Sequence, residues 1–261
     1  MNESIVIPAT YDYGLVALSV IIAVCAAYAA LDLTGRVVAA RNNFRVAWLC
    51  GGAIAMGTGI WSMHFTGMLA YRLPVPVYYH IPTVTLSLVA AIVASFIALF
   101  VVSRERMTPI RVIVGGLLMA GGICTMHYTG MAAMRLPAMH HYDTGWVLLS
   151  VAIALFVSWA ALGLTSQFRE DAPGLFFKVG CAVIMGFAIP AMHYTAMMAV
   201  SYTPVKGAPD LTFSAEISAL GNSAIIIITF VILGAVFLLR QRSVASSRNT
   251  SVAQTQGRQP A

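Results

Sequence analysis

The sequence predicts an all-α fold: a bundle of seven transmembrane helices with three parallel internal repeats, its N-terminus outside the membrane and its C-terminus inside. Three observations predict it. Hydrophobic residues make up 59% of the 261 residues and charged residues only 9%, with a mean hydropathy of +0.84. Seven stretches are long and apolar enough to cross a bilayer, and one hexapeptide recurs three times. Because soluble domains carry roughly 25% charged residues, we expect lipid to surround this chain.

Each of the seven predicted spans has about 20 residues or more without a formal charge. The first is not a cleaved signal peptide, because its leader, MNESIVIPATYD, holds two acidic residues and no basic one. The second is longer than a bilayer requires, which predicts tilt or extension beyond the lipid. In chain order the spans are Tyr13–Leu31, Val46–Tyr71, Thr83–Val102, Val112–Met134, Trp146–Ser166, Val179–Val200 and Ala219–Leu239.

The seventh span is followed by a polar segment without apolar periodicity. We therefore predict two parts: one membrane domain, residues 1–240, and a disordered, basic cytoplasmic tail, residues 241–261. No soluble output module is expected after the membrane domain.

The distribution of basic residues predicts the orientation. Twelve of the 15 Lys and Arg residues lie in the connections after spans one, three and five or in the tail. Only Arg72, Arg135 and Lys206 lie on the other side, so the positive-inside rule places the N-terminus outside. The net charge of +6 then faces anionic lipid headgroups and does not predict nucleic-acid binding. Seven tyrosines at the outer boundary are typical of an interfacial belt: Tyr11, Tyr13, Tyr71, Tyr78, Tyr79, Tyr142 and Tyr202.

The repeated hexapeptide reads MHFTGM at 63–68, MHYTGM at 126–131 and MHYTAM at 192–197. Each copy ends an inside-to-outside span, because two helices per repeat give all copies the same direction. His64, His127 and His193 should therefore share one depth in the outer half of the bilayer. If the repeats pack around a pseudo-threefold axis, the three imidazoles face one another.

Methionines accompany each histidine at helical spacing, one residue before, four after and eight before. At about 100° per residue these thioethers lie on an arc that includes the imidazole. Imidazole with thioether and no carboxylate is a donor set that favours copper, whereas zinc would recruit Cys, Asp or Glu. The candidate metal ligands are His64, His127, His193, Met63, Met126, Met192, Met68, Met131 and Met197.

Structural alternatives stay open for several of these residues. Methionine fills gaps in helix cores, which is the simpler explanation for Met56, Met119 and Met185, eight residues before each histidine. An intramembrane histidine can also bond across helices, although polar groups in lipid normally mark function. Gly67 and Gly130 are predicted to let helices approach closely.

Three further histidines lie in the predicted outer loops: His80, His140 and His141. With Met134 and Met139 they are candidates for a weak metal-capture site, and the alternative is that they are simply solvated.

The three hexapeptides resemble the MHYT domain, a bacterial integral membrane module, over about residues 10–240. The resemblance implies a sensory protein of the bacterial inner membrane that binds copper through Met63, His64, Met126, His127, Met192 and His193. It also implies sensing of O₂, CO or NO. MHYT domains often precede diguanylate cyclase, phosphodiesterase or kinase modules. Phe65 in place of tyrosine departs from the motif.

Two functions follow as hypotheses. The first is a sensor, in which a copper site responds to a diatomic gas or to redox state and a separate cytoplasmic or membrane partner carries the output. The second is a copper-handling protein: a carrier, store or assembly factor for membrane oxidases. Haem fits three equivalent histidines poorly, because its iron has two axial positions, and a purely structural bundle is the remaining alternative. No nucleophile–base constellation predicts an enzyme.

Overall fold

A computed structural model of the chain describes residues 6–40, 43–104, 108–166, 174–205, 207–216 and the isolated positions 225, 227, 229, 230 and 234. Within these residues six helices are long and apolar enough to cross a membrane. They are α1 (Tyr13–Ala39), α2 (Asn43–Ala70), α3 (Ile81–Val102), α4 (Pro109–Ala132), α5 (Thr144–Ser166) and α6 (Leu175–Met198).

These helices match the first six predicted spans, and most of the predicted seventh, Ala219–Leu239, lies outside the described residues. Thr229 is described: it is buried, and its hydroxyl forms a hydrogen bond with that of Ser62 in α2. The predicted tail, residues 241–261, also lies outside the described residues.

Helix α1 is eight residues longer than the predicted span, because it continues from Leu31 to Ala39. The prediction ended at the first charge, Asp32. That carboxylate is tolerated inside the helix because it pairs with Arg36 one turn later and with Lys178 of α6. The span was predicted from the length of the uncharged stretch, and that length does not show whether a charge is neutralised by a neighbouring side chain.

The six helices form a closed ring in chain order, since each packs against the next and α6 packs against α1. Helix α3 shows how the faces divide: Ser87, Ala91 and Ala94 face inward, while Val93 and Phe96 are exposed. Small residues inside and large apolar ones outside are typical of helices that pack together in lipid. The described helices therefore have the surface of a membrane bundle.

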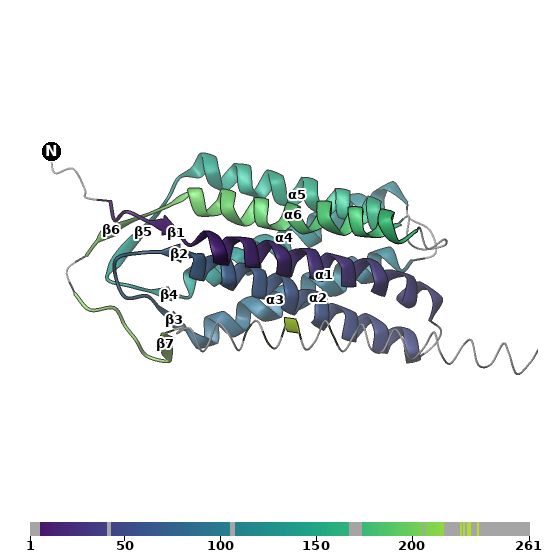
Figure 1. Cartoon of the computed structure of the whole chain (residues 1–261), viewed down its shortest axis with the longest axis horizontal. Helices are drawn as coiled ribbons and strands as arrows, with labels where there is room; N and C mark the ends of the chain where they lie inside the picture. The colour runs from purple at the N-terminus through teal and green to yellow at the C-terminus, as the bar shows by residue number, and fades with distance from the viewer. Residues whose placement is uncertain are drawn as a thin grey trace, which may run out of the picture.

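Seven short strands cover one end of the bundle (Figure 1), here called the capped end. The sequence predicted loops there, and the strands are an addition to the all-α expectation. They form three small antiparallel sheets of order β1-β2, β4-β3-β7 and β5-β6. The strands are β1 (Thr10–Tyr11), β2 (Tyr71–Arg72), β3 (Tyr78–His80), β4 (Met134–Arg135), β5 (Ala138–Tyr142), β6 (Val200–Pro204) and β7 (Ser214–Glu216).

The sheets join the ends of helices far apart in the sequence. In the longest pairing, Ala138 lies opposite Pro204 and Tyr142 opposite Val200, which connects the ends of α4 and α6. The predicted tyrosine belt is wrong for Tyr79 and Tyr202, which are 3% and 0% exposed. Both pack into a core cluster under the strands instead of facing the membrane interface.

Candidate metal centre

The histidines of the three hexapeptides meet on the bundle axis. His64 lies near the end of α2, His127 near the end of α4 and His193 near the end of α6. All three are at most 1% exposed. The predicted shared depth and the predicted convergence are both found in the structure.

The three Nδ1 atoms form a nearly equilateral triangle. The Nδ1 of His64 lies 3.1 Å from that of His193, and His127 lies 3.2 Å from each of the others. The centre of such a triangle is about 1.8 Å from each corner, close to the roughly 2.0 Å of an imidazole nitrogen–metal bond. Three lone pairs directed at one point repel one another unless a proton or a cation lies between them. This donor set fits a single metal ion.

No other group of three His, Cys, Asp or Glu side chains in the described part of the chain comes close enough together to hold a metal. The rings are nearly perpendicular to one another, with interplanar angles of 77°, 79° and 87°. Each imidazole also lies edge-on to the aromatic residue that follows it, Phe65, Tyr128 or Tyr194. Neighbouring rings therefore fix the orientation of each imidazole.

The second ring nitrogen, Nε2, is buried and without a hydrogen-bond partner in all three histidines. For two of them it faces a glycine of a neighbouring helix: the Nε2 of His64 faces Gly130, and that of His193 faces Gly67. A Cβ at these glycines would lie 2.3 and 2.5 Å from the nitrogen, closer than atoms can pack. The prediction assigned both glycines to helix–helix approach, and the structure shows that the group they admit is an imidazole.

A second layer of hydrogen bonds surrounds the triad, and the sequence analysis missed it. Each of α1, α3 and α5 carries a buried serine whose hydroxyl donates a hydrogen bond to the backbone carbonyl three residues earlier. Its oxygen is then free to accept from an aromatic side chain of a hexapeptide helix. The links are Tyr194–Ser19 at 2.9 Å, Trp61–Ser87 at 3.1 Å and Tyr128–Ser150 at 2.7 Å.

The sequence did contain a signal for these serines, a Leu-Ser pair followed by Val or Leu that recurs at 18–20, 86–88 and 149–151. The layer also explains Phe65, which has no hydroxyl. In that copy the indole of Trp61, one turn earlier, donates to Ser87 instead.

The predicted methionine ligands fall into two sets. Met68, Met131 and Met197, one turn beyond the histidines, all belong to one cluster toward the capped end. Those preceding the histidines are dispersed: Met63, Met126 and Met192 lie in three different apolar clusters. The structure thus gathers the first set above the triad and distributes the second set around it.

The family model MHYT, described as a bacterial signalling protein N-terminal repeat, matches residues 4–48, 57–115, 121–176 and 186–249. The chain belongs to the MHYT family. The last three matched segments each contain one of the triad histidines, and the first contains no histidine.

Curated relatives of this MHYT chain are signalling proteins. It is 44% identical over 194 residues to the bifunctional diguanylate cyclase/cyclic di-GMP phosphodiesterase MucR of Pseudomonas aeruginosa. The aligned residues make up 74% of this chain and 28% of MucR. It is 36% identical over 215 residues to the cyclic di-GMP phosphodiesterase NbdA of the same organism, 81% of this chain and 27% of NbdA. It is 33% identical over 196 residues to the signaling protein YkoW of Bacillus subtilis, 74% of this chain and 24% of YkoW.

The MHYT chain thus spans about a quarter of the length of these relatives. No solved structure matches it. Family membership and six apolar helices together make it a multi-pass membrane protein of a signalling family.

The outer histidines of this MHYT chain do not form the metal-capture group considered above. His80 lies on β3 and forms a hydrogen bond with Thr83, and His141 on β5 forms one with Thr203. The ring of His140 lies 5.0 Å from that of Tyr202, and burial, with Arg135 and His141 nearby, lowers its pKa. His80 lies in a different sheet from His140 and His141, so the three do not gather at one point.

The cluster above the triad contains two buried tyrosines, Tyr79 and Tyr202. Burial raises the pKa of both phenols, and neighbouring tyrosines raise that of Tyr202 further. Both therefore keep their protons, and the Tyr202 hydroxyl donates to the sulfur of Met134 at 3.6 Å. The capped side of the triad is a neutral, tightly filled layer of thioether and aromatic groups.

Proposed function

We propose that this MHYT protein is a membrane sensor module in which His64, His127 and His193 hold one copper ion and respond to a diatomic gas or to redox state. The observation that carries the proposal is the convergence of three buried Nδ1 atoms on one point. Burying three imidazoles in an apolar bundle is unfavourable without a partner, and a metal ion would supply that partner. Neutral nitrogen donors close to thioethers favour copper among the common metals.

A copper ion held there would supply reversible one-electron chemistry and a position open to O₂, CO or NO, because only three protein nitrogens converge. The chain's own residues hold and insulate it. The thioether and aromatic cluster above the triad excludes water on the capped side. Met63, Met126 and Met192 stay in the proposal as flanking thioethers, and Met68, Met131 and Met197 as the candidate soft ligands.

The same residues supply a way to transmit a change. An imidazole that shifts by a fraction of an ångström meets Gly67 or Gly130 of another hexapeptide helix, where there is no room to spare. Interfaces packed this tightly tend to switch between arrangements and do not deform smoothly. A change at the triad would therefore move α2, α4 and α6 relative to one another.

The direction of output follows from the charges. Among the described basic residues, Arg36, Arg45, Arg104, Arg111 and Lys178 lie at the helix ends opposite the strands. By the positive-inside rule they support a cytoplasmic position for that end and a position outside the bacterial inner membrane for the capped end. The relatives named for making or degrading cyclic di-GMP suggest the class of the signalling partner. We propose that the chain controls such an enzyme, carried by a separate protein, through its basic cytoplasmic rim.

The test is a gas titration of purified, copper-loaded protein, with the C–O stretching band of bound CO as the readout. The sensor proposal expects a band that is present in the wild type and in His141→Ala, a control outside the triad, and absent from His127→Ala. The copper-handling alternative expects a different result: no CO band, and transfer of copper to an apo-acceptor protein. That result would replace the sensor proposal with the alternative.

A further inference from the structure

We infer that an apolar cavity beneath the triad is a binding site for a small non-polar gas molecule, which enters from the lipid. The cavity has a volume of about 140 Å³. This inference rests on the proposed function for its purpose, and its existence can be tested without copper.

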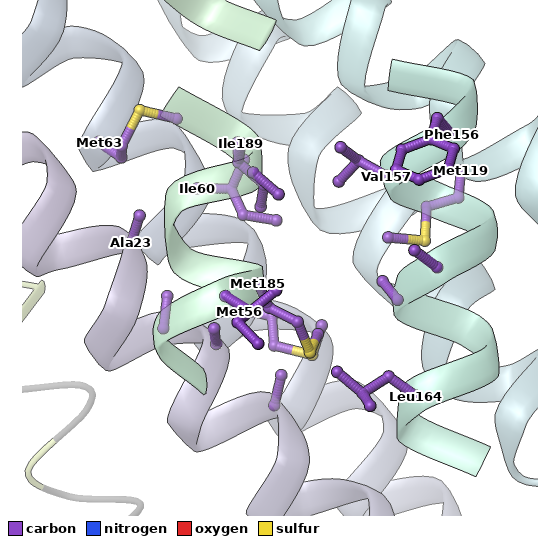
Figure 2. Close-up of a pocket in the computed structure, with 17 residues that line it drawn as sticks. Ala23, Met56, Ile60, Met63, Met119, Phe156, Val157, Leu164, Met185 and Ile189 are labelled. Atoms are coloured by element: carbon purple, nitrogen blue, oxygen red, sulfur yellow. The ribbon is translucent and has the colours of Figure 1, made fainter. Parts of the chain in front are cut away.

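The cavity is lined without a single polar residue. Figure 2 shows lining side chains of α2 and α6 across the space from Phe156, Val157 and Leu164 of α5. Alanines of α1 complete the wall on another side, including Ala23 and Ala27. An engineered apolar cavity of about 150 Å³ stays dry and binds benzene or xenon. Water gains no hydrogen bond here, whereas a non-polar gas loses nothing on entry.

The three methionines that stand eight residues before the histidines all line this cavity. Met56, Met119 and Met185 come from different helices, and the sequence interpretation of them was packing. They do fill space, yet they meet around one cavity. A thioether on a flexible chain adapts its shape to a mobile guest.

The cavity is open toward the membrane. Among its lining residues, Phe156 is 72% exposed and Ile184 is 69% exposed, and both lie on the outer surface of the helix ring. Ala160 of α5 also lines the cavity and is exposed as well, and it carries only a methyl side chain. O₂ is non-polar and CO and NO are nearly so, and hydrocarbon is therefore a better reservoir for them than water.

The cavity lies next to the triad along the helix axes. Ile60 and Ile189 stand four residues before His64 and His193, which is about 6 Å along a helix at 1.5 Å per residue. Met63, which directly precedes His64, also lines the cavity. A gas molecule held at this end of the cavity would lie about one helical turn from the triad. The cavity therefore serves the centre from the side that the capping cluster does not fill.

Xenon is the direct probe. Crystals of the full copper-free chain, grown from a lipidic mesophase and pressurised with xenon, should show an anomalous peak inside the cavity. Ala160→Phe should remove the peak by filling the mouth. Ala152→Phe should keep it, because Ala152 is another exposed alanine on the same helix that does not line the cavity. No peak in the wild type, or an acyl chain in its place, would overturn the inference.

A kinetic experiment then tests the route. In copper(I)-loaded protein, CO is released by a light flash and its rebinding is followed in the infrared. Ala160→Phe should rebind CO more slowly than both the wild type and Ala152→Phe, with unchanged copper content. Equal rates in all three would refute the route. A chain that takes up xenon but no copper would refute the proposed function and support this inference.

Discussion

The central feature of this protein is the set of ring nitrogens of His64, His127 and His193, whose contacts are explained best when the three rings are considered together. Each triad histidine directs Nδ1 at the other two and leaves Nε2 buried without a partner. If Nδ1 offers a lone pair to a metal, the ring proton must be on Nε2. That N–H has no acceptor, which costs roughly 1–3 kcal/mol per group. Three such groups in one bundle are a stability cost that a metal site would offset.

Gly130→Ala tests how tightly the imidazole is held. The new Cβ would lie 2.3 Å from the Nε2 of His64, so the ring must move and the Nδ1 triangle opens. We expect loss of bound copper and a lower melting temperature. Gly121→Ala, on the same helix, adds a Cβ with nothing within 4 Å. It should keep its copper and gain about 0.5–1 kcal/mol from the better helix former. Metal analysis and thermal unfolding measure both, and equal copper in the two variants would refute the tight fit.

At the scale of helices, the hexapeptide helices are tied to their neighbours by serine hydroxyls. The three links follow the ring, from α6 to α1, from α2 to α3 and from α4 to α5. Each leaves its aromatic ring edge-on to a triad histidine or one turn from it. The outer helices of the ring therefore hold the inner geometry.

We expect Tyr128→Phe and Ser150→Ala each to destabilise the protein by about 1 kcal/mol, the usual contribution of one hydrogen bond. Because the two side chains share that bond, the double variant should lose less than the sum. A double-mutant cycle on unfolding in detergent measures the difference. Strict additivity would show that the 2.7 Å contact contributes nothing.

The sequence predicted the described helices and the meeting of the three histidines, and it missed the strands and the roles of two glycines for identifiable reasons. Apolar length predicted the six described spans, and motif spacing predicted that His64, His127 and His193 converge. The strands could not be predicted, since pairs such as Ala138 with Pro204 join residues far apart in the chain. The roles of Gly67 and Gly130 depend on which helices lie next to each other, and the sequence pattern of a single helix does not contain that information.

On the scale of the whole molecule, a partly buried ion pair joins the first described helix of the ring to the last. Asp32 of α1 pairs with Lys178 of α6, and both side chains are 12% exposed. The Lys178 ammonium also lies 4.7 Å from the ring of Tyr28. This junction lies at the end opposite the strands, where we propose that output occurs. It joins α1 to α6 at that end of the bundle.

Lys178→Met should destabilise the protein by up to about 3 kcal/mol, because the partly buried carboxylate of Asp32 loses a basic partner. The matched control is Arg72→Met. Arg72 pairs with Asp12 at the capped end, and its side chain is 61% exposed. That change should have a much smaller effect, since solvent screens an exposed pair. Thermal unfolding of both variants measures the two losses of stability. Equal losses would contradict the importance of burial for this ion pair.

The most direct measurement on the central claim is the copper content of purified protein, wild type and single variants, from cells grown with added copper. We predict one copper ion per chain in the wild type and in His141→Ala. It should be lost in each of His64→Ala, His127→Ala and His193→Ala, with the helical circular dichroism unchanged. Copper absent from a folded wild type, or retained in all three triad variants, would contradict the account and reduce the hexapeptides to packing motifs.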